Sequence, residues 1–255
     1  MPFTLSHAAA AIPFRRTRLI PSALVAGCFA PDFEHLLRMR DAGAFSHTLP
    51  GVFLFDLPVV FIFLWFFHTY VKEPLWAALP ASARSRIDLG PRSFSIRTPS
   101  HFLLLVVSIL LGIGTHLLWD SFTHTDYWPY RHVPLLRVYL DLPILGPRPV
   151  WALLQNASSI LGLLVIVVWW HFAARSIPPR PISDNGISAQ KTRLTLLAAF
   201  AVALVAAVYS MLTSPLHGRS NLLAQALFVG MTIFWIEIVI YGFIRGRLQR
   251  EVRRT

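Results

Sequence analysis

Five long apolar segments constrain this chain more than any other feature of its sequence. A helix needs roughly 20 predominantly apolar residues to cross a bilayer, and each segment is close to that length. Hydrophobic residues make up 55% of the chain and charged residues only 14%, whereas a soluble domain carries about 25% charged residues. The segments cover residues 51–71, 101–119, 150–172, 194–212 and 222–244. We therefore predict an all-α fold, a polytopic membrane helix bundle of about five transmembrane helices with one or two short N-terminal helices that are half-buried or interfacial.

The basic residues are distributed unevenly between these segments. The formal net charge is +11. In a soluble protein this charge would indicate nucleic acid, but here it favours the anionic headgroups of the lipid bilayer as partner, and no nucleic-acid partner is expected. Fourteen Lys and Arg residues lie in the loops after the first and third segments and in the C-terminal tail, and four lie in the opposite loops. By the positive-inside rule we predict an integral membrane protein with a cytoplasmic C-terminus.

The N-terminal region conflicts with this topology. Residues 19–30 are apolar but too few to span a bilayer. If they nevertheless crossed, the arginines before them would lie inside, and His7 would be separated from the other polar motifs. The alternative is a lipoprotein signal cleaved before Cys28, although Pro21 breaks its short apolar core. Without a crossing, five arginines lie on the wrong side: Arg15, Arg16, Arg18, Arg38 and Arg40.

Composition divides the chain into three predicted parts. Residues 1–175 form a helical membrane domain that contains the His/Asp motifs, residues 176–193 form a cytoplasmic linker rich in Pro and Ser, and residues 194–255 form a two-helix membrane hairpin with a basic tail. Cys28 is the single cysteine, so an internal disulfide and a zinc site with two or more thiolates are both excluded. A bound metal would be held mainly by nitrogen and oxygen.

Histidine and aspartate residues recur at helical spacing in two motifs. His116, Asp120 and His124 follow one another at intervals of four residues. A helix would place them along one stripe, where imidazole and carboxylate groups on adjacent turns can share a divalent ion. Asp32 and His35 are three positions apart and would share one face of a second helix.

Two further histidines, His7 and His47, each follow a serine, as His116 and His124 each follow a threonine. A neighbouring hydroxyl group could orient a ligand ring; alternatively, these hydroxyl residues are helix N-caps and the histidines are incidental. In the five-helix topology the motifs fall on the face opposite the basic loops, with His7 among them unless the short segment crosses. We therefore predict a metal site with the ligands His7, Asp32, His35, His47, His116, Asp120 and His124.

Two other acidic residues lie in apolar surroundings. Glu237 lies midway through the fifth segment, where a charge is costly, and a polar contact with another helix is the preferred interpretation. Asp56 lies near the start of the first segment and before Pro58, so we expect a helix-start or turn role for it.

The same motifs resemble those of a known family. The start MPFTLSHAAAAIPF, the APDFEH and SHTLPG elements and the GxxTHxxxDxxTH element occur in this order in an uncharacterised bacterial integral membrane family, domain of unknown function 4184. They are also distantly similar to bacterial inner-membrane proteins classed by inference as metal-dependent hydrolases. Those proteins share an early His, a Pro-Asp-x-Asp-His element, a Thr-His-Ser element and a Ser-His-x-x-x-Asp element.

The correspondence covers the first half of the chain. Glu34 stands where the wider group has its second Asp, and residues 44–45 replace a lead-in to the central His that contains Gly and Arg. The resemblance implies a metal-dependent hydrolase located in the bacterial inner (cytoplasmic) membrane, and these departures leave its substrate open. The early His corresponds to His7, the second element to residues 31–35, the third to residues 46–48 and the last to residues 115–120.

Three functions are compatible with these residues. The first is a membrane-bound metal-dependent hydrolase acting at the membrane surface on a lipid headgroup or another phosphoester, with zinc as the expected metal. One zinc ion takes three protein ligands plus water, so seven ligands could hold two or three ions, and Glu34 is a candidate general base. The second is a metal or solute transporter, in which Glu237 would mark the ion pathway. The third is a non-catalytic membrane scaffold whose polar residues hold helices together.

Overall fold

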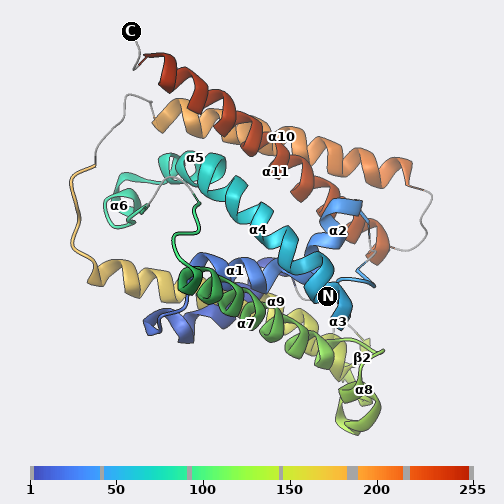
Figure 1. Ribbon diagram of the computed structural model, residues 1–255. Helices are drawn as coiled ribbons and strands as arrows, with labels where there is room; N and C mark the ends of the chain where they lie inside the picture. The colour runs from blue at the N-terminus through green and yellow to red at the C-terminus, as the bar shows by residue number, and fades with distance from the viewer. Residues whose placement is uncertain are drawn as a thin grey trace. The chain divides into compact units, whose positions relative to one another are not determined.

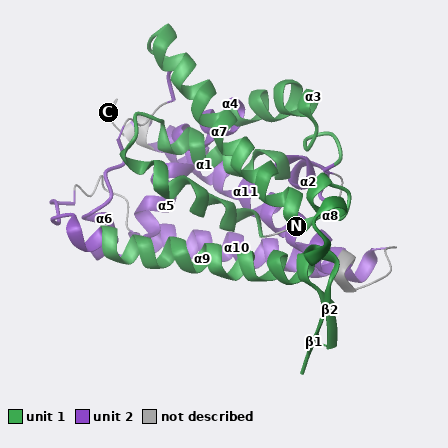
Figure 2. Cartoon of the chain, turned by 90° about the horizontal axis from the view of Figure 1, so that it is seen from below, with its two compact units in different colours: residues 1–32, 44–60, 96–173 green, residues 33–43, 61–95, 174–255 purple. Residues whose placement is uncertain are grey.

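The computed structural model describes residues 3–40, 43–90, 94–143, 146–182, 189–214 and 219–252. The contacts group the chain into two compact units, each built from three stretches of sequence (Figure 2). The predicted division into membrane domain, linker and C-terminal hairpin stays a prediction, and residues 183–188 of the linker lie outside the described residues. Unit 1 comprises Met1–Asp32, Ala44–Val60 and Ile96–Ala173, and unit 2 comprises Phe33–Gly43, Phe61–Ser95 and Ala174–Thr255.

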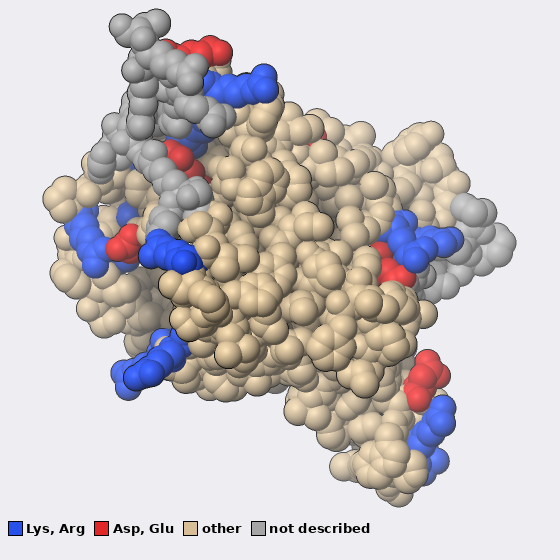
Figure 3. All heavy atoms as spheres, in the orientation of Figure 1, with Lys and Arg blue, Asp and Glu red and all other residues tan. Residues whose placement is uncertain are grey.

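Five helices among the described residues are long and apolar enough to cross a membrane, which confirms the predicted all-α polytopic architecture. Their apolar side chains stay exposed; in Val150–Ser176, none of the most apolar stretch is buried. Exposure of such an apolar surface to water is unfavourable, whereas lipid tails solvate it. Much of the face drawn in Figure 3 is accordingly free of Lys, Arg, Asp and Glu. The five spans are Leu49–Ala78, Pro99–His132, Val150–Ser176, Ala189–Thr213 and Leu222–Leu248.

The first span is a continuous helix with two π-helical segments. The Thr48 hydroxyl caps its start by accepting a hydrogen bond of 3.1 Å from the Gly51 N–H. Asp56 is fully buried inside this helix, so its expected helix-start role is wrong, because the helix begins already at Leu49. The parts are α3 (Leu49–Gly51), η3 (Val52–Asp56), α4 (Leu57–Phe66), η4 (Phe67–Val71) and α5 (Lys72–Ala78).

The N-terminus of unit 1 forms a helical hairpin. The 3₁₀ helix η1 (Thr4–Arg16) leads through a short turn into α1 (Pro21–Phe29). Pro21 stands in the first turn of α1, where its missing N–H has no helical partner to lose. The nine residues of α1 rise only about 13 Å, too little to cross a bilayer. Instead α1 packs against the long helix α7 (Pro99–Thr123), as Figure 1 shows.

Two glycines allow α1 to approach α7 closely. A Cβ atom at Gly27 would collide with the carbonyl group of Ile109, and a Cβ atom at Gly112 would collide with the carbonyl oxygen of Leu24. Small residues at such a contact are typical of helix pairs in membranes. The close packing fixes α1 on α7 by contacts of the backbone itself.

The other arm of the hairpin, η1, runs along α9 (Val150–Ser176). Near its start, the Phe3 N–H donates a hydrogen bond of 2.9 Å to the Ser159 hydroxyl. Near its end, Arg15 lines the same pocket as Trp169 of α9. The chain therefore travels along α9 in η1 and returns along α7 in α1.

The hairpin shows the course of the short apolar segment. Since α1 brings the chain back, His7 and Asp32 lie at one end of the hairpin, and the turn with Arg15, Arg16 and Arg18 lies at the other. The Ile20 N–H at this turn donates a hydrogen bond of 3.0 Å to the hydroxyl of Ser108 on α7. The three arginines therefore lie away from the polar motifs, while His7 stays beside those motifs.

A small β-hairpin follows α7, and this β-hairpin was not predicted from the sequence. Helices α8 (Trp128–His132) and η5 (Pro134–Arg137) lead into β1 (Tyr139–Leu142), which pairs antiparallel with β2 (Gly146–Pro149). The two prolines of β2 lack N–H donors and so weaken the strand signal.

Unit 2 contains the pair of α10 (Ala189–Thr213) and α11 (Arg219–Val252), which lie side by side in Figure 1. Its buried core contains Val71, Leu196 and Ile238. The Thr232 hydroxyl of α11 donates a hydrogen bond of 2.6 Å to the Leu36 carbonyl of α2 (Phe33–Arg38). A four-residue helix, α6 (Ala81–Arg84), completes the unit.

Candidate metal centre

Side chains from four segments of unit 1 converge at the end of the hairpin where His7 lies. His116 and Asp120 come from successive turns of α7, His7 from η1, Asp32 from the short helix η2 (Ala30–Asp32), and His47 from the stretch before α3. Four of the five are buried and His47 is partly buried. We call these five residues the polar cluster.

The Asp120 carboxylate lies at the centre of the polar cluster. Its Oδ1 is 3.4 Å from Nε2 of His7. Its Oδ2 is 3.4 Å from Nε2 of His116 and 3.7 Å from Nε2 of His47. The Nε2 atom of His116 is also 3.7 Å from Oδ1 of Asp32. Each contact joins an imidazole Nε2 to a carboxylate oxygen, so the donor atoms of all five residues point into one shared space.

A backbone carbonyl fixes the tautomer of His116. Its Nδ1 lies 2.8 Å from the carbonyl oxygen of Cys28. Because a carbonyl oxygen only accepts, Nδ1 must carry the proton, and the lone pair of the neutral ring is on Nε2. Metal-binding histidines are commonly held in this way by their second nitrogen. His116 thus presents a lone pair to the centre of the cluster.

A serine holds His47 by the same logic. The Ser46 hydroxyl donates a hydrogen bond of 2.6 Å to the carbonyl of Pro31, which uses its proton. It can then only accept from Nδ1 of His47, at 3.1 Å. The Nε2 atom of His47 is left with the lone pair, and this is the atom that faces Asp120.

Asp32 is oriented by a threonine of η1. The Thr4 hydroxyl donates a hydrogen bond of 2.6 Å to Oδ2 of Asp32. The other carboxylate oxygen, Oδ1, is the one that faces His116. Asp32, Thr4 and His116 are all buried, so this arrangement is shielded from water.

Five buried atoms of the polar cluster have no hydrogen-bond partner among the described residues. They are Nε2 of His7, Oδ1 of Asp32, Nε2 of His116 and both carboxylate oxygens of Asp120. Leaving a buried polar atom unsatisfied costs about 1–3 kcal/mol, and native structures keep few such atoms. A cation held by one set of three of these residues would give a partner to the atoms that face it.

The spacing of the donor atoms fits a metal ion. Two ligands of a tetrahedral ion with bonds of about 2.0–2.1 Å lie about 3.4 Å apart. The four Nε2-to-oxygen distances of the cluster are 3.4–3.7 Å. Two sets of three, His7 with His116 and Asp120, and Asp32 with His47 and His116, each keep their donor atoms within 4.8 Å of one another. This buried His/Asp group can hold a metal ion.

His7 is neutral in this environment. Burial, together with the neighbouring His116 ring, lowers the pKa of His7 to about 3. The two rings are stacked, with centroids 3.9 Å apart and an interplanar angle of 20°. A neutral imidazole is the form that binds a metal.

His124 lies at the margin of the polar cluster, off the helical stripe that its spacing predicted. Helix α7 ends at Thr123, and His124 follows in an extended conformation (φ −130°, ψ 146°). Its Nδ1 is 3.0 Å from the backbone oxygen of Asp120 and 3.8 Å from the Asp120 carboxylate. It belongs to neither set of three, and its role as a ligand stays a prediction.

Glu34 and His35, the other two predicted site residues, belong to unit 2. The buried His35 ring stacks on Phe228, with centroids 4.9 Å apart. The Glu34 carboxylate accepts a hydrogen bond of 3.0 Å from the Arg38 guanidinium. The ligand role of His35 and the general-base role of Glu34 stay predictions. Glu237 of α11 is half-buried, and its Oε2 has no hydrogen-bond partner among the described residues.

Sequence reasoning found the polar cluster but missed most of what orients it. Of the four hydroxyl–histidine pairs, Ser46–His47 is the one in which a hydroxyl orients a cluster histidine; the Thr115 hydroxyl instead donates to the Gly112 carbonyl of its own helix. Sequence patterns did not predict that Thr4 and the carbonyl of Cys28 orient ligands of the cluster. A threonine three positions before a histidine carries no recognisable signal, and a backbone carbonyl carries none at all.

Comparison with protein families places this chain in an uncharacterised group. The model of the family Domain of unknown function (DUF4184) matches residues 1–243, and the chain belongs to this family. No curated protein and no solved structure matches it.

Proposed function

We propose that the polar cluster binds a divalent metal ion, with zinc expected, and that the protein is a membrane-bound metal-dependent hydrolase. The observation that supports this is the convergence of five unsatisfied buried atoms in a cluster where two sets of three residues each bring their donor atoms within 4.8 Å of one another. The expected substrate is an ester of a lipid or another phosphoester at the membrane surface. This function goes beyond the family, whose activity is unknown.

The shared position of His116 supports a single ion rather than the two or three that seven ligands could hold. His116 belongs to both sets of three, and Nε2 of a neutral imidazole has one lone pair. Its other nitrogen, Nδ1, donates a hydrogen bond to the carbonyl oxygen of Cys28. One ion, held by either set of three ligands, therefore fits better than two ions bound at the same time.

The donor set favours a transition metal. Three imidazole nitrogens and two carboxylates suit zinc and its neighbours, whereas Mg²⁺ and Ca²⁺ prefer oxygen ligands alone. When bound, such an ion supplies a Lewis acid and lowers the pKa of a coordinated water towards about 7. The two Asp residues would offset its charge, and the hydrogen bonds to Cys28 and Ser46 would keep two of the rings in the ligating tautomer.

A substrate would approach from the side of His47 and His124. Their side chains are 11% and 27% exposed, whereas those of His116 and Asp120 are fully buried. His124 also directly follows the end of α7, where a transmembrane helix is expected to reach the headgroup layer. This position is why we propose an ester at the membrane surface as the substrate.

Metal content tests the binding step. In detergent-purified wild-type protein, mass spectrometry should find about one equivalent of zinc or manganese per chain, and His116→Ala and Asp120→Asn should lose most of it. His132→Ala, which removes an exposed histidine of α8, is the matched control and should keep the metal. No metal in the wild type after incubation with zinc, or equal metal in all variants, would overturn the proposal.

The hydrolytic step has a separate test. Metal-loaded and metal-stripped protein would be assayed for ester cleavage against a panel of phospholipids and chromogenic carboxyl and phosphate esters. We expect cleavage of at least one class with metal and none after stripping. Absence of cleavage across the panel by metal-loaded protein would reject the hydrolase and leave the metal site intact.

One observation favours the alternative of a non-catalytic scaffold. The central residues of the cluster are completely buried, and they come from four separate segments. Contacts among these side chains would join the hairpin to α7 and to the start of α3. In this case the protein would hold no metal, and His116→Ala would cost it its fold rather than an activity.

A further inference from the structure

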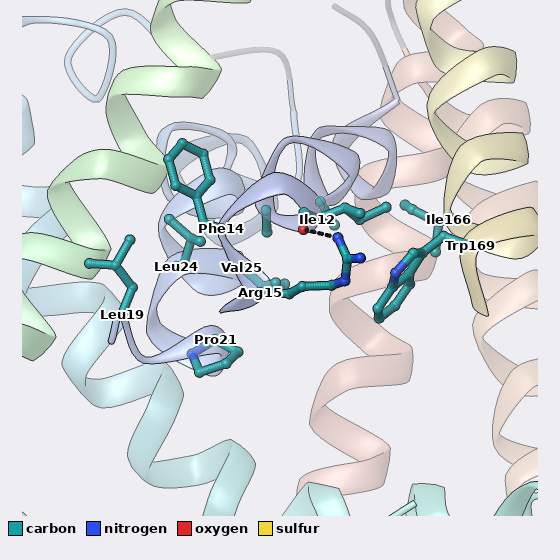
Figure 4. Close-up of a pocket in the computed structure, with 11 residues that line it drawn as sticks. Ile12, Phe14, Arg15, Leu19, Pro21, Leu24, Val25, Ile166 and Trp169 are labelled. Carbon is teal, nitrogen blue, oxygen red and sulfur yellow. Dashed lines mark hydrogen bonds between the residues drawn. The ribbon is translucent and has the colours of Figure 1, made fainter. Parts of the chain in front are cut away.

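The turn of the η1–α1 hairpin holds an apolar pocket beside three arginines. The pocket has a volume of about 200 Å³ and lies between the hairpin and α9 (Figure 4). In Figure 4 the Arg15 side chain extends between Ile12 and Trp169. Apart from Arg15, the lining is apolar and includes Ala8, Ala11, Ile12, Leu24, Ile166 and Trp169.

The three arginines lack acidic partners. Arg15, Arg16 and Arg18 are exposed, and none of them forms an ion pair among the described residues. Arg15 makes a single long hydrogen bond, 3.4 Å from its Nη1 to the Ile12 carbonyl. Arginines at the edge of an apolar region normally have a partner, and here none of the described carboxylates serves.

The pocket lies at a level where lipid headgroups meet acyl chains. Trp169 and Trp170, followed by His171 and Arg175, end the apolar part of α9, and tryptophans at a helix end mark the headgroup boundary. Arg15 shares the pocket with Trp169, whereas Ile166 lies about one helical turn deeper. The charged side of the pocket thus faces the headgroups and its apolar side faces the acyl chains.

We propose that this pocket binds one anionic phospholipid of the surrounding bilayer. The lipid phosphate would pair with Arg15 and its neighbours Arg16 and Arg18, and part of one acyl chain would fill the apolar pocket. The charge selects an anionic lipid, because the cationic headgroup of a zwitterionic lipid would add positive charge beside three arginines. The three arginines that would bind the lipid phosphate lie at the opposite end of the hairpin from the polar cluster, so the lipid is not the hydrolase substrate, and the proposal does not depend on the proposed function.

A lipid in this position would hold η1 against α9. The arm of the hairpin that it contacts is also the arm that carries His7. Binding should therefore stabilise the hairpin as a unit, and its loss should be measurable as a lower thermal midpoint.

Native mass spectrometry of the full chain in detergent tests the proposal, with added phosphatidylglycerol or phosphatidylcholine carrying the same acyl chains. We expect wild-type protein to retain one phosphatidylglycerol and to bind phosphatidylcholine at least tenfold more weakly. Arg15→Gln should weaken phosphatidylglycerol binding about fivefold, as expected for about 1 kcal/mol per arginine near an anionic surface. The triple variant R15Q/R16Q/R18Q should abolish binding.

Two variants test the contribution of the apolar pocket to lipid binding independently of the arginine charges. Ala11→Phe and Ile166→Trp fill the pocket from opposite walls without removing an arginine, and each should reduce retention of phosphatidylglycerol by at least tenfold. Arg175→Gln removes a charge at the end of α9 and should leave binding unchanged. Variants are compared only where circular dichroism and gel filtration match those of the wild type.

Equal retention of the two lipids by the wild type would overturn the proposal. Undiminished binding in the triple arginine variant would do the same, as would undiminished binding in whichever pocket-filling variants fold. If Arg175→Gln weakened phosphatidylglycerol binding as much as Arg15→Gln does, the binding would be explained by nonspecific surface charge, and the proposed site would be rejected.

Discussion

Nδ1 of His116 lies 2.8 Å from the carbonyl oxygen of Cys28, and this contact joins the candidate metal centre to the end of α1. Cys28 stands in the last turn of α1, and Pro31, three residues further along the chain, has no N–H that could donate to its carbonyl group. The ring of a neighbouring helix can therefore use it as an acceptor. The close packing of Gly27 against α7 holds this carbonyl in place, so the fold of the hairpin and the orientation of the ligand depend on the same contact.

Metal removal should destabilise the wild-type protein and leave His116→Ala unaffected. A ligand present at 100 times its dissociation constant stabilises the folded state by about 2.7 kcal/mol, which corresponds to a shift of about 5–10 °C in thermal midpoint for a chain of this size. Thermal denaturation in detergent with and without a chelator measures this shift. His132→Ala should respond as the wild type does. An equal response of His116→Ala and the wild type would show that the chelator acts elsewhere.

Thr4→Val should weaken metal binding without removing a ligand. The substitution removes the hydroxyl that donates to Oδ2 of Asp32 and keeps the shape of the side chain. Loss of such a supporting hydrogen bond typically costs tenfold to a hundredfold in affinity. A competition titration against a fluorescent zinc indicator measures the change. Thr17→Val, which removes an exposed hydroxyl bonded to the Phe14 carbonyl, should bind as the wild type does, and equal affinity of both variants would contradict the assignment.

The five spans could be predicted because the required property is local. An apolar stretch of about 20 residues has few alternatives to a membrane helix, whatever its neighbours are. The hairpin of η1 and α1 could not be predicted, because its course depends on contacts with distant residues such as Ser108 and Ser159. The length and composition of the short apolar segment alone did not determine whether Arg15 and His7 lie near each other or apart.

The members of the polar cluster could be named from spacing and resemblance, but their geometry could not. The stripe of His116 and Asp120 extends only as far as the helix, which ends at Thr123. The chain beyond it carries no helix-breaking residue until Pro129, so the spacing alone extended the stripe to His124. Asp56 was misplaced for the opposite reason, because the helix starts earlier than its apolar composition indicates.

Ala at Gly112 should destabilise the protein, whereas Ala at Gly114 should not. A Cβ atom at Gly112 would meet the backbone of α1, while nothing lies within 4 Å of a Cβ atom at Gly114. Overpacking of this kind costs about 1–3 kcal/mol, whereas replacing an unhindered helical glycine with alanine gains up to about 1 kcal/mol. Thermal midpoints of the two single variants in the same detergent measure the difference. Equal destabilisation by both would mean that α1 does not pack on α7 as described.

Cysteine labelling should place strand β1 and the arginine turn of the hairpin on opposite sides of the membrane. Cys28 is fully buried, so the wild type should not react with a membrane-impermeant maleimide until it is denatured, and it serves as an unreactive background. Leu140→Cys, on the exposed strand β1, lies beyond the end of α7 that carries the polar cluster. Arg16→Cys lies at the opposite end of the hairpin. We expect Leu140→Cys to react in intact cells and Arg16→Cys to react only in inverted vesicles, because the positive-inside rule places the arginines in the cytoplasm. Reaction of both variants from the same side would show that the membrane does not lie between strand β1 and the arginines of the hairpin turn, and reversed labelling would invert the predicted orientation.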